Sequence, residues 1–282
     1  MKILVTGGAG FIGTNLIKRL LLEGHEVESL DNYETGTQNN HIEDCTYHFG
    51  DVRAIGSGID RDYELIYHLA GLSRIQPSFI NPIDTFEANT VGTQEVCEFA
   101  REIKAKLIYS GSSSRWHNPY LSPYACYKHL GEEICKMYRT AFDMDIEIVR
   151  FYNVYGPYEI VYGDWAAVIG KWRGQIENNY PITIVGDGKQ RRDFTHVDDI
   201  VDGLYRIGMS NEKHEDAWEL GTGKNYSINE VADMFVERFS CVKVYMSDQK
   251  GNYRETLRKN KDAMNRLGWK PSDKLEQYIK SL

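Results

Sequence analysis

The sequence predicts an α/β fold built on a doubly wound parallel sheet, and three observations carry that prediction. Short β-branched runs alternate with amphipathic helical stretches through the first half of the 282-residue chain. A glycine-rich turn over Gly7–Gly13 joins the first predicted strand to the first predicted helix. Asp31 ends the second predicted strand, about 20 residues further on, where such folds place an acidic residue.

Six strands and three helices are predicted in the first half of the chain. The strands are Lys2–Thr6, Glu26–Leu30, Thr46–Phe49, Leu65–Leu69, Lys106–Tyr109 and Glu147–Phe151. The helices are Phe11–Leu22, Ile83–Glu102 and Tyr124–Phe142. Because helices separate consecutive strands, we expect a parallel sheet with helices on both faces.

The alternation loosens after Gly156-Pro157. Helices are expected at Trp165–Glu177, His196–Ile207, Ile228–Phe239, Asp262–Leu267 and Leu275–Leu282, and strands at Ile182–Val185 and Ala217–Leu220. We expect Ala217–Leu220 to return to the main sheet. The predicted division is a Rossmann domain at residues 1–155 with segments returning near 193–222, and a smaller α/β C-terminal domain at 156–192 and 223–282.

Composition narrows the class of protein. The formal net charge of −8 gives no bulk attraction for nucleic acid or anionic lipid. The five cysteines lack CxxC spacing, so no metal site is expected, and free thiols in a reducing compartment are favoured. No signal peptide precedes the first strand, and the apolar runs are shorter than the roughly 20 residues of a membrane span. We expect a soluble, cytoplasmic protein.

The glycine-rich turn is a candidate cofactor site. Gly7 permits a tight turn, Gly10 permits close approach of a pyrophosphate, and Gly13 allows the helix to pack on the strand. The helix N-terminus then offers free N–H groups to the pyrophosphate. Asp31 would bind the adenosine ribose and repel a 2′-phosphate, and no Arg or Lys immediately follows it, so NAD is favoured over NADP.

A second glycine-containing turn follows the third strand. Gly50, Asp51 and Val52 are placed to meet the adenine of a bound dinucleotide. Taken alone, the same residues are equally compatible with a plain turn capped by an aspartate.

Tyr124 and Lys128 are the candidate acid/base pair, one helical turn apart on the same helix face. A free tyrosine has a pKa of about 10, and a nearby ammonium would lower it toward neutrality. Outside this context most such pairs are a half-buried Tyr and a solvated Lys. Tyr127 has no Lys four residues after it.

A serine run, Ser110–Ser114, follows a predicted strand. Ligands bind at the carboxyl ends of strands in open α/β sheets, so a hydroxyl there could hydrogen-bond a reacting oxygen of the substrate. A serine-rich turn with capping hydroxyls is the alternative interpretation.

These motifs together resemble the NAD-dependent sugar epimerase/dehydratase family of extended short-chain dehydrogenases/reductases. The matching segments span nearly the whole chain: Thr6–Gly13, Leu30–Asn32, Gly50–Val52, His68–Gly71, Glu87–Thr93, Ser122–Lys128, Arg150–Pro157, Arg191–Gly203 and Leu267–Pro271. The resemblance implies an NAD-binding Rossmann domain and a smaller substrate-binding domain.

The resemblance also implies roles for individual residues. Tyr124 would be the acid/base, Lys128 its partner and Ser112 the catalytic hydroxyl. The substrate, a nucleotide-sugar, would be bound by Ser78, Asn153, Arg192 and Arg254. The cofactor would be bound by Gly7, Gly10, Phe11, Ile12, Gly13, Asp31, Asn32, Asp51, Val52, Leu69, Ala70, Gly71, Asn89, Tyr124 and Lys128. The two longest helices, near 85–103 and 124–142, match those that form a four-helix bundle in homodimers.

Three departures from the family pattern bear on function. Dehydratases of the family have Thr-Asp-Glu where this chain has Ser112, Ser113 and Ser114, and the acid of related decarboxylases is also missing at Ser114. The segment between Ser112 and Tyr124 is short and carries Arg115-Trp116. In place of a C-terminal Arg-Pro-Gly stands Gln249-Lys250-Gly251, so Arg254 or Arg258 would substitute.

The function expected is epimerisation of a nucleotide-sugar, at C4 of a UDP-hexose-like substrate, through a transient keto-sugar. A net sugar-nucleotide dehydrogenase or 4-keto-reductase would use the same residues but exchange cofactor each cycle. A non-catalytic NAD-binding regulator is the third hypothesis, and the intact Tyr124 and Lys128 weigh against it. Polysaccharide biosynthesis follows from the resemblance alone.

Overall fold

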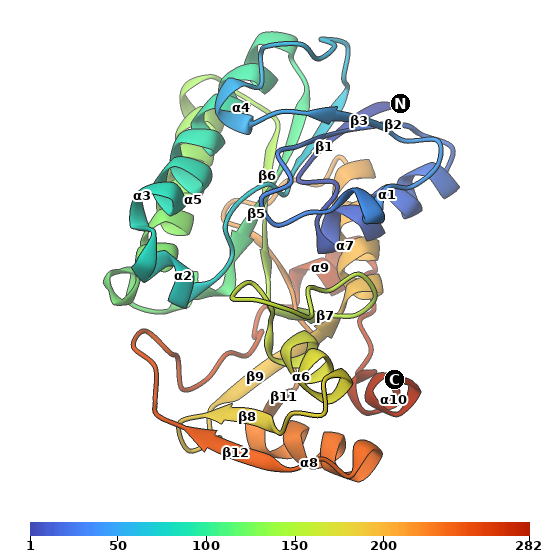
Figure 1. Ribbon diagram of the computed structural model, residues 1–282. Helices are drawn as coiled ribbons and strands as arrows, with labels where there is room; N and C mark the ends of the chain where they lie inside the picture. Colours follow the sequence, from blue (N-terminus) through green and yellow to red (C-terminus); the bar gives the residue numbers. More distant parts are fainter.

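The computed structural model describes residues 1–282. Its centre is a seven-stranded parallel sheet with the order β10-β6-β5-β4-β1-β2-β3 (Figure 1). The bounds are β1 Lys2–Thr6, β2 Glu26–Asp31, β3 Thr46–Phe49, β4 Leu65–His68, β5 Lys106–Ser112, β6 Ile146–Phe151 and β10 Trp218–Leu220. The predicted Rossmann-type α/β fold is confirmed, and the segment ending at Leu220 does return to the sheet beside β6.

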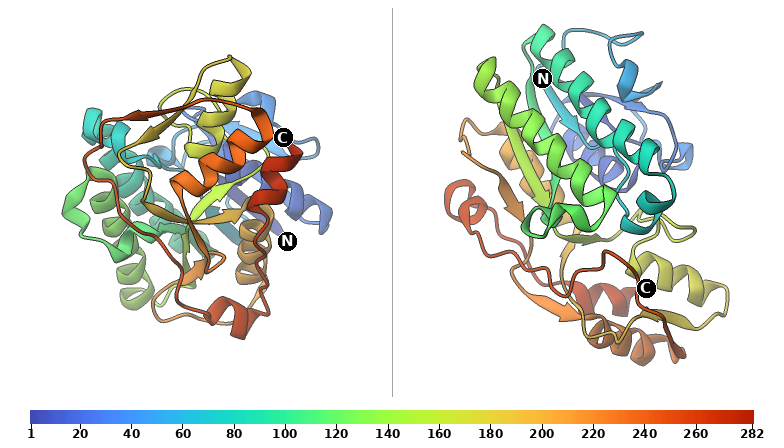
Figure 2. Two further views of the ribbon diagram at one scale, coloured as in Figure 1. Left: turned by 90° about the horizontal axis from the view of Figure 1, so that it is seen from below. Right: turned by 90° about the vertical axis from the view of Figure 1, so that its left-hand side faces the viewer.

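Helices cover both faces of this sheet. On one face, α1 (Phe11–Leu22) and α7 (Val197–Met209) share a core cluster with β1, β6 and β10. On the other face, α4 (Gly92–Ile103) and α5 (Pro123–Ala141) share a second cluster with β4 and β5. Figure 2, right, shows α4 and α5 running side by side along the outside of the sheet.

The predicted helix Ile83–Glu102 is interrupted. It consists of α3 (Pro82–Phe86), a π-helical turn at Glu87–Val91 and α4, and a short helix α2 (Ile75–Ile80) precedes it. Single π turns inside helices are frequent at functional sites. This one carries Asn89, one of the predicted cofactor residues.

Smaller sheets and a third core lie below the main sheet in Figure 1. One sheet has the order β11-β9-β7 and another the order β12-β8. Their bounds are β7 Asn153–Tyr155, β8 Ile182–Val185, β9 Arg191–His196, β11 Asn225–Ser227 and β12 Lys243–Met246. The helices around them are α6 Val168–Glu177, α8 Ile228–Phe239, α9 Asp262–Leu267 and α10 Leu275–Ser281. Trp172 of α6 and Phe235 of α8 pack edge to face in this core. The division into two domains stays a prediction.

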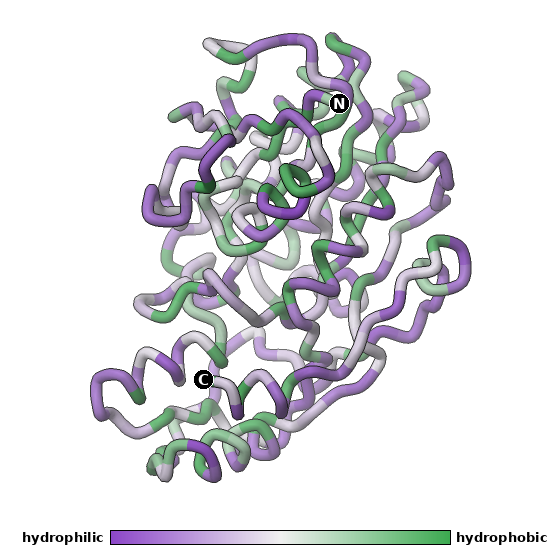
Figure 3. Tube along the Cα trace, turned by 90° about the vertical axis from the view of Figure 1, so that its right-hand side faces the viewer, coloured by the Kyte–Doolittle hydropathy of each residue, from purple (hydrophilic) through white to green (hydrophobic).

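The hydropathy of the trace follows these layers. In Figure 3 hydrophobic segments run through the interior, and hydrophilic ones dominate the outer loops. No helix combines the length and the apolar character needed to cross a bilayer.

The sheet order has one functional consequence. Strand β1 lies between β2 and β4. The strands β2 and β3 are therefore added on one side of β1, and β4, β5 and β6 on the other, so that the direction reverses between β1 and β4. Ligands of open α/β sheets bind outside the carboxyl ends of the strands at such a switch point.

Candidate active site

A cleft of about 850 Å³ opens at the carboxyl ends of β1, β4 and β5. Its wall includes most of the residues predicted to bind the cofactor or to act in catalysis: Gly7, Gly10, Phe11, Ile12, Gly13, Asp31, Asn32, Asp51, Val52, Leu69, Ala70, Gly71, Ser112, Tyr124 and Lys128. Asn153 and Arg192 line it from the side of the smaller sheets. The cleft thus lies between the large sheet and the small ones.

The glycine turn has no room for side chains. Gly7 has φ +75°, and a Cβ there would lie 2.7 Å from the Ala70 backbone nitrogen. A Cβ on Gly13 would lie 2.2 Å from the Gly7 carbonyl oxygen. Helix α1 begins after Gly10 without a side-chain cap, so its first N–H groups stay available to an anion. The residues therefore fit the pyrophosphate of a dinucleotide.

Two aspartates mark the adenosine end of the cleft. Asp31 ends β2, and its carboxylate accepts hydrogen bonds from the N–H groups of Ala9 (2.9 Å) and Tyr33 (2.8 Å). Burial raises the pKa of Asp31, and these two bonds oppose the rise. Asp51 accepts from the side chain of Asn32 over 3.1 Å, and its hydrogen bonds with Arg53 hold its pKa below the usual value.

Asn89 shapes the cofactor groove without lining it. Its amide oxygen accepts from the Leu72 N–H, and its amide nitrogen donates to the Leu72 carbonyl, both over 2.9 Å. The buried side chain thereby fixes the segment that begins at Leu69 and lines the cleft. We infer that Asn89 positions the groove, while its predicted contact with the cofactor stays a prediction.

The three predicted catalytic residues come together at one point of the cleft. Ser112 ends β5, and the Tyr124 hydroxyl of α5 donates to the Ser112 hydroxyl over 3.2 Å. Lys128 follows one turn later, with its Nζ 4.7 Å from the centre of the Tyr109 ring. Ser122 caps α5 by accepting from the Ala125 N–H over 3.1 Å, which fixes the start of the helix that carries the pair.

The charges around Tyr124 include one that the sequence did not predict. Burial raises the pKa of Tyr124, and the Ser112 hydrogen bond and the nearby charge of Arg74 lower it. Arg74 is thus a cation near Tyr124 that the sequence did not predict, and the effect of Lys128 on Tyr124 stays a prediction. Burial lowers the pKa of Lys128 to about 8, against the opposing charge of Glu132.

Sequence reasoning missed Arg74, although it lines the cleft. The signal was available, because a basic residue shortly after a strand that borders the switch point is placed to face the ligand.

The opposite wall of the cleft offers a second guanidinium. Arg192 of β9 donates to the Arg191 carbonyl (2.9 Å) and to the Asn252 side-chain oxygen (2.7 Å), and no carboxylate pairs with it. Burial lowers its pKa to about 10. The side-chain oxygen of Asn153 accepts from Thr256 over 3.2 Å nearby. A buried cation without a counter-ion is suited to an anionic ligand.

Two predicted substrate residues lie outside this cleft. Ser78 is buried on α2 beside the first turn of α5, where its hydroxyl accepts from the Tyr124 N–H over 3.1 Å and donates to the Ile75 carbonyl over 2.7 Å. Arg254 points to solvent and pairs with Asp187 over 3.1 Å. The structure therefore does not bring Ser78 or Arg254 to the substrate cleft, because local partners hold both side chains elsewhere.

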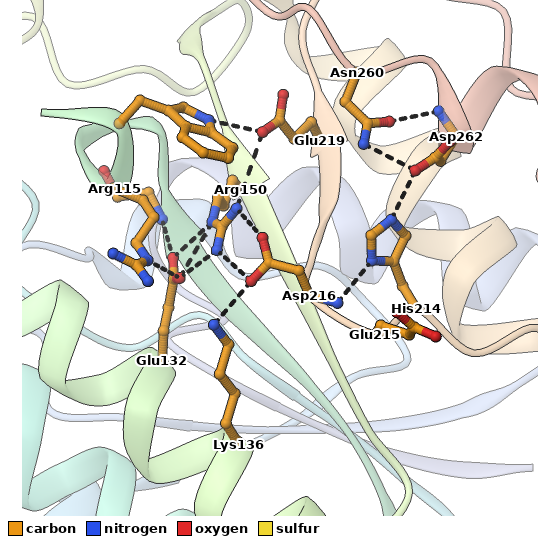
Figure 4. A network of polar contacts seen from close by, with 12 residues as sticks. Arg115, Glu132, Lys136, Arg150, His214, Glu215, Asp216, Glu219, Asn260 and Asp262 are labelled. Atoms are coloured by element: carbon orange, nitrogen blue, oxygen red, sulfur yellow. Dashed lines mark hydrogen bonds and ion pairs between the residues drawn. The ribbon is translucent and has the colours of Figure 1, made fainter.

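The short loop after Ser112 is anchored by a buried ionic network, drawn in Figure 4. Arg150 of β6 pairs with Glu132 of α5 over 2.8 Å and with Asp216 over 2.7 Å. Its guanidinium also lies 5.1 Å from the Trp116 ring centre, and the Trp116 indole donates to Glu219 over 2.7 Å. The unusual Trp116 therefore fastens the loop to the strands beneath it.

Comparison with known proteins decides the family. The family model described as the NAD dependent epimerase/dehydratase family matches residues 3–221. The chain belongs to this family. It is an enzyme of the extended short-chain dehydrogenase/reductase type, its cofactor is NAD, and the family's substrates are nucleotide-sugars.

Relatives extend over almost the whole chain. A putative UDP-glucose 4-epimerase of Methanocaldococcus jannaschii is 31% identical, over 99% of this chain and 96% of that protein. UDP-glucuronic acid decarboxylase 4 of Arabidopsis thaliana is 28% identical, over 99% of this chain and 67% of that protein.

Solved structures of family members superpose closely. UDP-glucose 4-epimerase of Thermotoga maritima with UDP-glucose has a TM-score of 0.91 at 25% identity, covering 99% of this chain and 96% of that one. MoeE5 in complex with UDP-glucuronic acid and NAD has a TM-score of 0.86 at 26% identity, with the same coverage. The relatives are thus named for two different reactions, epimerisation and decarboxylation.

Proposed function

We propose that this enzyme is an epimerase that inverts C4 of a UDP-hexose-like nucleotide-sugar through a transient keto-sugar. The observation that carries the proposal is the Tyr124–Ser112 hydroxyl pair in a cleft whose neighbouring positions, Ser113 and Ser114, hold no carboxyl group. Hydroxyl deprotonation and reprotonation need one acid/base. Elimination of water or loss of CO₂ would call for an additional acid or base at the serine run.

Each residue of the site has its own proposed role. Tyr124 takes the proton of the sugar hydroxyl and later returns it, while the Ser112 hydroxyl orients that oxygen. The charge of Arg74 favours the phenolate form of Tyr124, and Lys128, one helical turn away, is proposed as a second cation with the same effect. Arg192 and Asn153 hold the diphosphate on the far wall. Bound NAD would accept a hydride from the sugar carbon and give it back, so that no net oxidation results.

Names of relatives support this proposal without deciding it. Proteins named UDP-glucose 4-epimerase from Methanocaldococcus jannaschii and Mycolicibacterium smegmatis match 99% of the chain at 31% and 30% identity. The decarboxylase relatives are 27 to 28% identical. The absence of a carboxyl group at Ser113 and Ser114 favours the epimerases over the decarboxylases.

The test uses purified protein without added NAD. It is incubated with a panel of UDP-, dTDP-, GDP-, CDP- and ADP-sugars, and products are identified by NMR while reduced nicotinamide is followed by absorbance. We expect a C4 epimer without net NADH. Stoichiometric NADH formation or consumption would show a dehydrogenase or reductase instead, and no product from the whole panel would contradict the proposal.

We also propose a homodimer through α3–α5 of two copies. Exposed apolar side chains gather on these helices: Ile83 and Phe86 on α3, and Leu130 and Met137 on α5. Such a patch on a soluble protein is typical of an interface. Light scattering after gel filtration should give twice the chain mass, and Ile83→Glu should reduce it to that of one chain.

A further inference from the structure

Arg74 is a charged side chain that the reaction described above does not fully use. Its Nε donates to the Trp165 carbonyl over 2.8 Å, and its Nη1 donates to the Ser73 carbonyl over 2.9 Å. Both acceptors are neutral, and no carboxylate lies within ion-pair distance of the guanidinium. Nη2 makes no hydrogen bond within the protein, and Arg74 lines the open cleft.

The surroundings of Arg74 place it at the sugar end of the cleft. Arg74 directly precedes α2, and Ser78 of α2 accepts a hydrogen bond from the N–H of Tyr124, the proposed acid/base, over 3.1 Å. Arg192, by contrast, lies on β9, where it bonds to Arg191 and Asn252. The two guanidiniums therefore reach the cleft from different elements, and one diphosphate held by Arg192 leaves Arg74 without a counter-ion.

Glu159 does not neutralise Arg74. Its carboxylate pairs with Arg173 over 3.1 Å, and burial raises the pKa of Glu159 to about 7. The other oxygen, Oε2, is buried without a hydrogen-bond partner, and no ion pair joins Glu159 to Arg74. A partly desolvated guanidinium without a counter-ion is unfavourable unless a ligand supplies an anion.

We propose that Arg74 is a specificity-determining residue that binds a carboxylate on the sugar ring, so that the preferred substrate is a nucleotide-linked uronic acid. This inference rests on the proposed function, because it places the sugar beside Tyr124. Arginine is suited to the task, since its planar fork can bind a carboxylate through two parallel hydrogen bonds. The hydroxyls of Ser113 and Ser114 line the same cleft and can complete the carboxylate's hydrogen bonding.

The test measures binding, which does not depend on turnover. Dissociation constants for UDP-glucuronic acid, UDP-glucose and UDP are determined by calorimetry on the NAD-loaded wild type and on Arg74→Gln, Arg74→Lys and Arg61→Gln. Arg61 is a matched control, since it is exposed, pairs with Glu102 and lies outside the cleft. Thermal unfolding shows whether each variant is folded.

We expect the wild type to bind UDP-glucuronic acid on the order of ten times more tightly than UDP-glucose, because a charge-assisted hydrogen bond to a carboxylate is stronger than one to a neutral hydroxyl. Arg74→Gln should remove that preference while changing the affinities for UDP-glucose and UDP by less than about threefold. Arg74→Lys should keep part of the preference for UDP-glucuronic acid, and Arg61→Gln should keep all of it.

Three results would overturn the inference. The wild type could bind UDP-glucose as tightly as UDP-glucuronic acid. Arg74→Gln could weaken all three ligands equally, which would assign Arg74 to the diphosphate. Arg74→Gln could leave the uronate preference intact. Each is distinct from failure of the proposed function, which would appear as normal binding with no epimer formed from either sugar.

Discussion

The hydroxyl groups of Tyr124 and Ser112 are joined by a 3.2 Å hydrogen bond, although one residue lies in the first turn of α5 and the other at the end of β5. The bond holds the tyrosine oxygen at the carboxyl edge of the sheet, where ligands of this fold bind. It also opposes the effect of burial on the pKa of Tyr124. The hydroxyl groups of the proposed acid/base and of the proposed orienting residue are thus adjacent in the structure.

Tyr124→Phe should lower kcat on the order of 100- to 10,000-fold, because it removes the general acid/base and little else. Affinity for NAD should change little. Tyr127→Phe, on the same helix but packed against Phe86, is the matched control and should leave kcat unchanged. Steady-state kinetics with calorimetric NAD binding would distinguish the two, and near-normal turnover by Tyr124→Phe would refute the assigned role.

Gly7→Ala should weaken NAD binding by at least about tenfold, equivalent to about 1.4 kcal/mol. A Cβ at Gly7 would lie 2.7 Å from the Ala70 nitrogen and distort the turn that faces the pyrophosphate. Gly24→Ala is the control, since Gly24 has a similar φ of +79° but a Cβ added there would meet nothing within 4 Å. It should cost about 1 kcal/mol of stability and leave NAD affinity intact. Equal NAD affinities of the two variants would be inconsistent with the site.

Stability should depend on pH through Glu159. Its pKa in the folded protein is about 7, above the ordinary 4.5, so the folded state binds the extra proton. Its contribution is therefore full below about pH 4.5 and is lost as the pH rises to about 7. Relative to Glu159→Gln, the free energy of unfolding of the wild type should fall by up to roughly 3 kcal/mol across that window. Urea unfolding at several pH values tests this, and parallel curves would contradict it.

Glu132→Gln should lower the free energy of unfolding by roughly 3 kcal/mol, the lower end for a broken buried ion pair, because Asp216 still holds Arg150. Glu133→Gln, its half-exposed neighbour, should cost no more than about 0.5 kcal/mol. The two are compared by chemical unfolding. A similar cost for both would mean that the network in Figure 4 does not stabilise the fold.

The sequence predicted the large sheet well and the small sheets poorly, for a physical reason. Strands such as β1 are buried on both faces and read as continuous apolar runs. Strand β9 reads as polar, because Arg192 and Asp193 lie within it. Its buried Asp193 is satisfied by the N–H groups of Thr222 and Gly223, both over 2.9 Å, which are distant in sequence.

The same distinction holds for the candidate site. The glycine turn and the Tyr124–Lys128 pair follow from local spacing, so the sequence could predict them. The role proposed for Arg74 rests on the absence of a counter-ion near its guanidinium in the folded structure. Spacing along the sequence cannot reveal such an absence. Arg254 illustrates the opposite case, since it lies outside the cleft and pairs with Asp187 of another segment.

The central claim is that the sugar carbon gives up a hydride and receives the same one back within this cleft. The most direct measurement uses UDP-hexose deuterated at C4, incubated with the wild-type enzyme, with the product examined by NMR and mass spectrometry. The account predicts a C4 epimer that keeps its deuterium, with no reduced cofactor accumulating. An epimer whose C4 deuterium has been replaced by solvent hydrogen would contradict it.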